Sequence, residues 1–212
     1  MSDGPANTSA PDLALAIASL AVPGLLVAHR LIQPGDEDAL LPEEVASVAA
    51  PISRRQRASG AARIVARTLL AQLGYNHAAI PKHASGAPIW PEGIVGSLAH
   101  DDRIAVAAVA RTGTLSAVGI DVEPAEALPP DMLSLVVTPQ EMQSITDDPL
   151  HGRVLFAVKE AVYKAVFPLD QRFLEFQDIN VDLPRERATI SGGRLVAVRH
   201  CLSSHIVALA FI

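Results

Sequence analysis

The segment that most constrains how this chain can fold is GIDVEP at residues 119–124, where acidic and apolar residues alternate. Alternate side chains of a β-strand point to opposite faces of a sheet, so Asp121 and Glu123 project together while the residues between them point into a core. Pro124 then ends the strand and leaves both carboxylates at its exit. Two carboxylates on one face suit Mg²⁺, which takes a few protein oxygens and keeps other positions for water or phosphate. Taken alone, a D-x-E pattern is more commonly an ordinary solvent-facing strand end.

A second segment, FAVKEAVYK at residues 156–164, lies within a predicted helix over residues 149–166, with Pro168 after its end. Apolar residues at helical spacing give this helix one buried face. Its other face carries two aromatic and two charged residues: Phe156, Glu160, Tyr163 and Lys164. A glutamate and a lysine four residues apart form an ordinary surface ion pair in many helices. Because this chain is only 4% aromatic, the two aromatic neighbours indicate the wall of a pocket instead.

The composition and the order of elements predict an α+β protein. The chain has 212 residues, 50% of them hydrophobic and few of them aromatic, so a sizeable core must be built from Ala, Val, Leu and Ile. A helix followed by a pair of strands is predicted twice, without a visible sequence repeat. The first set is a helix over residues 51–74 with strands over 94–98 and 104–110. The second set is a strand over 117–122, the helix over 149–166, and strands over 194–199 and 206–212.

These elements divide the chain into three parts. The small and polar residues 1–11 predict a disordered tail. Residues 12–115 form an N-terminal half, which opens with a short helix and a buried strand over residues 25–28, and residues 116–212 form a C-terminal half. The apolar start of the N-terminal half predicts neither a signal peptide nor a membrane span, because a Pro-Gly pair splits it and no basic residue precedes it. The single cysteine, Cys201, is interpreted as a buried apolar side chain, which favours the cytoplasm.

Charge is segregated along the chain. Residues 45–91 contain no acidic residue, whereas residues 112–152 contain acidic residues but no Lys or Arg. The basic side chains of the first block are Arg54, Arg55, Arg57, Arg63, Arg67 and Lys82. An anionic ligand would suit the first block and a cation the second, but two solvated faces that pair with each other explain the pattern equally well. The net charge of −6 argues against a nucleic-acid partner.

Together, the two segments resemble the signatures of the 4′-phosphopantetheinyl transferases, of the larger type associated with surfactin and enterobactin synthetases. Those signatures are G-[I/V]-D-x-E and [F/W]-x-x-K-E-[A/S]-x-x-K, and they occur here at residues 119–123 and 156–164. The enterobactin-type branch adds an arginine-rich helix, which residues 54–74 resemble. It also adds a G-x-P-x-W-P-x-G-x-x-G-S-L-x-H segment, found at residues 86–100, and a Y-K-A-x-F-P-L stretch, found at residues 163–169.

The resemblance covers roughly residues 40–182 and carries implications for fold, reaction and partners. It implies the 4′-phosphopantetheinyl transferase fold, with two pseudo-symmetric α+β halves and the active site in the cleft between them. The reaction would move 4′-phosphopantetheine from coenzyme A to a serine of an acyl or peptidyl carrier protein, with Mg²⁺, and would release adenosine 3′,5′-bisphosphate. The partner would be a carrier protein rather than a nucleic acid or a membrane, and the enzyme would be a cytoplasmic monomer.

The resemblance also implies roles for residues at matched positions. Asp121, Glu123 and Glu160 would hold Mg²⁺. Glu160 would take the serine proton, directly or through a bound water, and Lys164 would neutralise charge on the diphosphate beside His100. The side chains that would bind coenzyme A are Arg55, Arg63, Lys82, Ser97, His100, Lys159 and Tyr163.

One departure separates this chain from the family pattern. The family usually has Ser, Thr or Cys directly after the histidine and a nearby Gly, whereas this chain has DDR at residues 101–103. Two alternatives therefore stay open. One is a coenzyme A binder without catalytic activity, and the other is a Mg²⁺-dependent hydrolase of a nucleotide diphosphate. Transfer to a carrier protein would distinguish the transferase from both.

Overall fold

The computed structural model describes residues 10–45 and 54–212, so the predicted disordered tail over residues 1–11 lies almost entirely outside the described part. The last two residues of that tail instead begin helix α1 (Ala10–Ala18), which corrects the prediction for them. Asp12 lies in the first turn of this helix, where a negative charge is favourable to the helix dipole.

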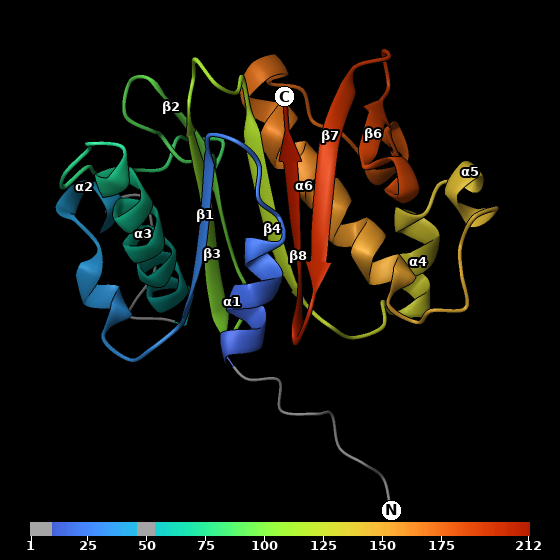
Figure 1. The fold of residues 1–212 in the computed structure, drawn as a ribbon, viewed down its shortest axis with the longest axis horizontal. Helices are drawn as coiled ribbons and strands as arrows, with labels where there is room; N and C mark the ends of the chain where they lie inside the picture. The colour runs from blue at the N-terminus through green and yellow to red at the C-terminus, as the bar shows by residue number, and fades with distance from the viewer. Residues whose placement is uncertain (1–9, 46–53) are drawn as a thin grey trace, which may run out of the picture.

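The N-terminal unit is a three-stranded antiparallel sheet with one long helix against it (Figure 1). Its elements are β1 (Leu25–Leu31), η1 (Asp36–Ala39), α2 (Pro42–Val45), α3 (Arg54–Gln72), β2 (Ile94–His100) and β3 (Ile104–Arg111). The strand order is β1-β3-β2, so β3 is central, and all of its residues except the last are buried. The many alanines of β3 leave room for close packing on both faces. β1 is longer than the predicted strand over 25–28 and is mostly half-buried, because it is an edge strand.

The C-terminal unit is a five-stranded antiparallel sheet with the order β4-β8-β7-β6-β5. Its elements are β4 (Val118–Pro124), α4 (Pro130–Val136), α5 (Pro139–Met142), α6 (His151–Asp170), η2 (Phe176–Asp178), β5 (Ile179–Asp182), η3 (Leu183–Arg185), β6 (Arg187–Ile190), β7 (Leu195–Leu202) and β8 (His205–Phe211). The hairpin of β5 and β6 and the short helices α4 and α5 are absent from the sequence prediction. Their segments are too short for periodicity to identify them.

The two units share one topology, which confirms the predicted α+β fold with two pseudo-symmetric halves. In each unit a strand is followed by a long helix and later by a hairpin, and the first strand pairs with the last strand of that hairpin. In the second unit this hairpin is β7–β8, and the β5–β6 hairpin is inserted before it. β1 pairs with β3 in the first unit, and β4 pairs with β8 in the second. The division into residues 12–115 and 116–212 stays a prediction.

The two sheets lie side by side, with their edge strands β2 and β4 next to each other, and α3 and α6 pack on the faces opposite α1 (Figure 1). One hydrophobic cluster joins both sheets, and it includes Val106 and Ala108 of β3 as well as Ile120 of β4 and Leu209 of β8. α1 adds Leu13 to the same cluster. This shared core fixes β2 and β3 against β4, and that contact sets the position of the residues discussed below.

Helix α6 runs beyond its predicted end. It was expected to stop at residue 166, before Pro168, but it continues to Asp170 with the proline inside. A proline in the last turn removes only one helix hydrogen bond, and the left-handed Gln171 then closes the helix by donating its N–H to the carbonyl of Phe167. No helix in the described part of the chain is both long and apolar enough to cross a membrane.

Candidate functional site between the two halves

Strand β4 holds two acidic side chains on one side, as the alternating pattern predicts. Ile120 and Val122 are 0% and 2% exposed within the core, while Asp121 and Glu123 point the other way, toward α6. Asp121 is itself only 6% exposed. A carboxylate buried to this degree needs a cation or hydrogen-bond donors beside it.

Gly119 allows α6 to lie directly against β4. A Cβ atom at this position would lie 1.9 Å from the carbonyl oxygen of Ala161 and 2.7 Å from the amide nitrogen of Ala165, so only glycine fits. The close approach puts Glu160 and Lys164 of α6 next to the carboxylates of β4. The glycine of the GIDVE signature therefore has a packing role in the geometry of the site.

Lys164 makes the closest contact across this interface. Its Nζ lies 2.6 Å from Asp121 Oδ1 and donates a second bond to the carbonyl oxygen of Ile120 at 3.3 Å. The other oxygen, Asp121 Oδ2, is buried and has no hydrogen-bond partner in the described structure. Burial raises the pKa of Asp121, although the nearby Lys164 charge opposes the rise.

The three acidic residues predicted to bind metal influence one another electrostatically. Burial raises the pKa of Glu160, and the negative charge of Asp121 raises it further. The pKa of Glu123 is raised in the same way, first by burial and then by Asp121. The charge of Asp121 thus acts on both of the other acids.

Two basic side chains take part in holding these acids. Lys164 binds Asp121, and Arg153 Nη1 lies 2.8 Å from Glu123 Oε2. Sequence reasoning missed Arg153, although it lies two helical turns before Glu160 on α6 and could have been found from that spacing. Among the described residues, no group of three or more acidic, His or Cys side chains is close enough to enclose a metal ion as placed.

The donor set nevertheless fits a divalent metal in its chemistry. All three side chains offer hard carboxylate oxygens, which Mg²⁺ prefers. Asp121 Oδ2 is a buried acceptor without a partner, and a bound cation would satisfy it. Burial raises the pKa of all three acids, and the charge of Asp121 adds to the rise at Glu123 and Glu160, so a nearby cation would favour their charged forms.

The N-terminal half contributes cations to the same region. His100 ends β2, and its pKa is lowered first by burial and then by the positive charges of Lys164 and Lys82. The pKa of Lys82 is lowered by burial and by the charges of Arg63 and Arg55. These effects show that basic groups from α3, the following loop and α6 share one region between the halves, which is the arrangement an anionic ligand requires.

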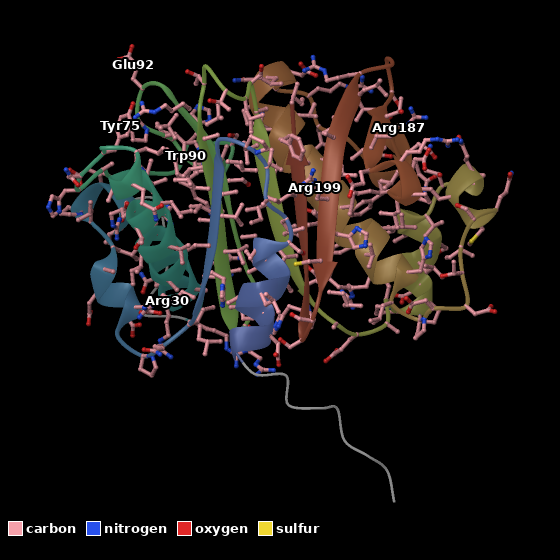
Figure 2. All side chains as sticks on the ribbon, viewed as in Figure 1. Arg30, Tyr75, Trp90, Glu92, Arg187 and Arg199 are labelled. Atoms are coloured by element: carbon pink, nitrogen blue, oxygen red, sulfur yellow. The ribbon has the colours of Figure 1, made fainter. Side chains whose placement is uncertain are left out.

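Two cavities open beside these residues. One has a volume of about 480 Å³, and its lining includes Ser97, Glu160, Tyr163 and Lys164. Trp90, on the loop before β2 (Figure 2), also lines this cavity, and its indole packs over Gly96. The mixed apolar and charged lining suits a ligand with an extended arm and a charged end.

The second cavity, of about 1200 Å³, is lined mainly by charged side chains and turns. Arg54 and Arg55 come from the start of α3, His100 from the end of β2, and His205 from the start of β8. The structure therefore brings Arg55 and His100 together at one cavity and Ser97, Glu160, Tyr163 and Lys164 at the other.

Lys159 does not reach either cavity. Its side chain is 0% exposed, and its ammonium donates to Glu141 Oε2 at 2.8 Å and to the carbonyl oxygens of Val136 and Phe176 at 2.7 and 3.0 Å. All three partners belong to the C-terminal half. A coenzyme A contact was expected at this position, but the ammonium faces the protein interior, because residues 159 and 160 lie about 100° apart around a helix.

Arg63 is also buried, with 3% of its surface exposed. Its Nε donates to the carbonyl oxygen of Ile80 at 2.9 Å, and its Nη1 donates to Ser59 Oγ at 2.5 Å. Glu44 Oε1 lies 3.6 Å from Nε. Arg63 therefore connects α3 to the loop that carries Lys82, and its expected phosphate contact stays a prediction.

Comparison with known proteins agrees with this fold and site. Residues 43–110 match the model of the 4′-phosphopantetheinyl transferase N-terminal domain, and residues 117–210 match the model of the 4′-phosphopantetheinyl transferase superfamily. These matches and the relatives described below identify an enzyme of the transferase class. The chain belongs to the 4′-phosphopantetheinyl transferase superfamily.

Three relatives carry that name. The chain is 41% identical over 155 residues to the 4′-phosphopantetheinyl transferase Npt of Nocardia iowensis, which covers 72% of this chain and 70% of that protein. It is 41% identical over 145 residues to PptT of Mycobacterium tuberculosis, covering 66% of this chain and 64% of that protein. It is 32% identical over 188 residues to Svp of Streptomyces mobaraensis, covering 85% and 76%.

Proposed function

We propose that this enzyme transfers 4′-phosphopantetheine from coenzyme A to a serine hydroxyl of an acyl or peptidyl carrier protein, with Mg²⁺, and releases adenosine 3′,5′-bisphosphate. The main observation behind this proposal is that Asp121 binds Lys164 and acts electrostatically on Glu160, beside a cavity lined by both halves. Membership of the superfamily supports the reaction class. We further propose the surfactin- and enterobactin-associated type, enterobactin branch, from the signatures at residues 86–100 and 163–169.

The binding step uses basic side chains of both halves. Arg55 and Lys82 would bind the phosphates of coenzyme A through their charges and His100 through a hydrogen bond from its imidazole, since these groups converge on the region between α3 and β4. Ser97 and Tyr163 line the smaller cavity, where the pantetheine arm would lie. Binding in this orientation would place the diphosphate beside Lys164.

The chemical step is an in-line displacement at phosphorus. The serine oxygen of the carrier protein forms a bond to the phosphorus that bears pantetheine, and the bond from that phosphorus to the bridging oxygen of the bisphosphate breaks. Glu160 takes the serine proton, and its raised pKa makes it a better base than an ordinary glutamate. Lys164 and His100 stabilise the charge that collects on the departing bisphosphate.

Asp121, Glu123 and Glu160 would hold Mg²⁺, which when bound supplies positive charge to the diphosphate and improves the leaving group. Lys164 would keep the buried Asp121 ionised before the metal binds, because their contact favours the charged carboxylate. Arg153 would do the same for Glu123.

The direct test is incubation with coenzyme A, Mg²⁺ and a panel of apo carrier proteins, followed by mass spectrometry. A mass gain of one phosphopantetheine group on the carrier, lost in Glu160→Ala, supports the proposal. Glu92→Ala is the control, because Glu92 is exposed on the loop before β2 and lines neither cavity (Figure 2). Bisphosphate release without a carrier would favour the hydrolase, and coenzyme A binding without any transfer would favour the inactive binder.

We also propose that the enzyme acts as a cytoplasmic monomer. Support comes from the net charge of −6 and from the single cysteine, Cys201, which is buried and has a pKa raised by burial to about 11. Size-exclusion chromatography with light scattering tests the monomer, and a mass of twice 22.3 kDa would contradict it.

A further inference from the structure

The acidic turn at residues 101–103, which departs from the family pattern, has its own set of contacts. Asp101 follows His100 directly, and its Oδ1 accepts the backbone N–H groups of Arg103 and Ile104, both at 2.7 Å. Asp102 Oδ2 lies 3.0 Å from Arg54 Nη1, on the exposed start of α3. The two carboxylates therefore point at protein partners, and Asp101 shapes the turn itself.

The second oxygen of Asp101 reaches the other half of the molecule. Oδ2 lies 2.9 Å from Nε2 of His205, the first residue of β8. Nε2 is buried and makes no hydrogen bond of regular geometry in the described structure, so its contact with Asp101 is electrostatic. The His205 side chain is 2% exposed and that of Asp101 is 15% exposed. Nδ1 of His205 lies 3.0 Å from Ser204 Oγ, so each imidazole nitrogen has a polar neighbour.

The position of His205 connects this contact to the proposed metal site. In the sheet, His205 pairs with Pro124 at the exit of β4, directly after Glu123. The Asp101–His205 contact thus joins the turn that follows His100 to the strand that carries the metal-binding candidates. Asp101, His100 and His205 all line the cavity of about 1200 Å³.

We propose that Asp101 and His205 form a latch between the two halves, and that the latch positions His100 toward coenzyme A. Asp101 and His205 are positioning residues, because their own polar atoms face each other and the turns rather than the ligand. The measurement of coenzyme A binding rests on the proposed function, whereas the Asp101–His205 contact does not. Two N–H donors and an imidazole surround the Asp101 carboxylate and offset part of its charge beside the cavity.

The ionisation of Asp101 agrees with this arrangement. Burial alone would raise its pKa, but the contacts with His205 and with the N–H groups of Arg103 and Ile104 outweigh burial and lower it. The carboxylate of Asp101 is therefore ionised at neutral pH and stays in place beside His205.

The test is a double-mutant cycle with Asp101→Asn and His205→Gln. Asparagine keeps an oxygen for the two turn N–H groups but removes the charge that faces His205, so the turn is preserved while the latch is weakened. We expect each single variant to weaken coenzyme A binding, measured by calorimetry, by about tenfold, and the double variant to be no weaker than either single variant. Asp147→Asn, at an exposed site outside both cavities, is the control and should bind like the unaltered protein.

The outcomes separate the latch from the proposed function. If both single variants bind coenzyme A like the unaltered protein, or if their effects simply add, the latch does not position His100. If only the melting temperature falls, the contact is structural and the positioning role is wrong. If the unaltered protein itself neither binds coenzyme A nor modifies a carrier, the proposed function fails. The double-mutant cycle measured by melting temperature then still tests whether Asp101 and His205 interact. Should Asp101→Asn fold poorly, Asp101→Ser restores the usual family residue and provides the second variant.

Discussion

Lys164 and Asp121 form an ion pair of 2.6 Å between α6 and β4, from positions 43 residues apart in the chain. The pair joins the two signature segments at one point. Asp121 is the buried partner, while Lys164 is 29% exposed on the side of the cleft. Its ammonium is therefore both the cation that holds the carboxylate and a cation within reach of a ligand.

Replacing Lys164 by methionine should remove most of the transfer activity. The ammonium would be lost both from Asp121 and from the diphosphate, and removal of one preorganised charge of this kind costs about 10²- to 10³-fold in rate. The measurement is kcat/KM for coenzyme A with a carrier protein. Arg187→Met, at an exposed site on β6 (Figure 2), should leave the rate unchanged. Equal rates in both variants would exclude Lys164 from the reaction.

The transfer rate should fall on the acid side at a higher pH than an ordinary glutamate would give. Glu160 must be ionised to take the serine proton, and burial together with Asp121 raises its pKa. As the pH drops through that raised value, the base form disappears and kcat declines with it. A pH profile of kcat checks this, and an acid limb at the pH of an ordinary glutamate would contradict it.

Glu160→Gln should stabilise the protein without ligand at neutral pH while abolishing transfer. A carboxyl with a raised pKa binds its proton more tightly in the folded state, so its favourable contribution exists at acid pH and is lost as the pH rises through the raised value. A neutral glutamine removes the cost of the buried charge, and the melting temperature should rise by a few degrees at neutral pH. The difference should shrink toward acid pH, where Glu160 is protonated. Glu92→Gln, on the exposed loop, should show neither effect.

Gly119→Ala should destabilise the fold strongly. The added methyl group would lie 1.9 Å from the backbone carbonyl oxygen of Ala161, which cannot move without displacing α6. Overpacking of this kind costs about 3 kcal/mol in the free energy of unfolding. Gly113→Ala is the matched control, because nothing lies within 4 Å of its added Cβ. Urea denaturation measures both, and a cost near zero for Gly119→Ala would contradict the close contact of α6 with β4.

Lys159→Met and Arg55→Met should fail in different ways. Lys159→Met leaves Glu141 buried at 2% exposure without its ammonium partner, which costs about 3–5 kcal/mol in stability. Arg55→Met, at the cavity lined by Arg55 and His100, should leave stability within about 0.5 kcal/mol and raise KM for coenzyme A. Denaturation and kinetics together separate the two. A rise in KM without loss of stability in Lys159→Met would restore its predicted role in cofactor binding.

The spacing of residues along the chain predicted much of the site, because it fixes the face of a strand or helix from which each side chain points. The alternation around Asp121 requires that it share a face with Glu123, and helical spacing requires that Glu160 and Lys164 share a face on α6. The same reasoning placed β2, β3 and β8 within a few residues. It failed at Pro168, where a helix end depends on the loop that follows, and at β5 and β6, which are too short to show a period.

Local pattern could not decide which charged residues become buried. Lys159 and Glu160 are neighbours on α6. Helical spacing puts Lys159 on the face of Leu155 and Val162, but the groups that let an ammonium stay buried there come from distant segments. α5 and the end of α4 lie over Lys159, because Glu141 caps α5 and accepts N–H groups from Thr138 and Val181 while binding the lysine. Contacts between residues this far apart in the sequence depend on the complete fold.

By itself, the sequence determined the strand that carries Asp121, the helix that carries Glu160, and the residue types that suit phosphoryl chemistry, because periodicity and side-chain chemistry are local properties. Only the tertiary structure decided which charges meet. The side-chain partners of Lys164, Lys159 and Asp101 lie between 18 and about a hundred residues away along the chain, and the packing of the complete fold brings them into contact.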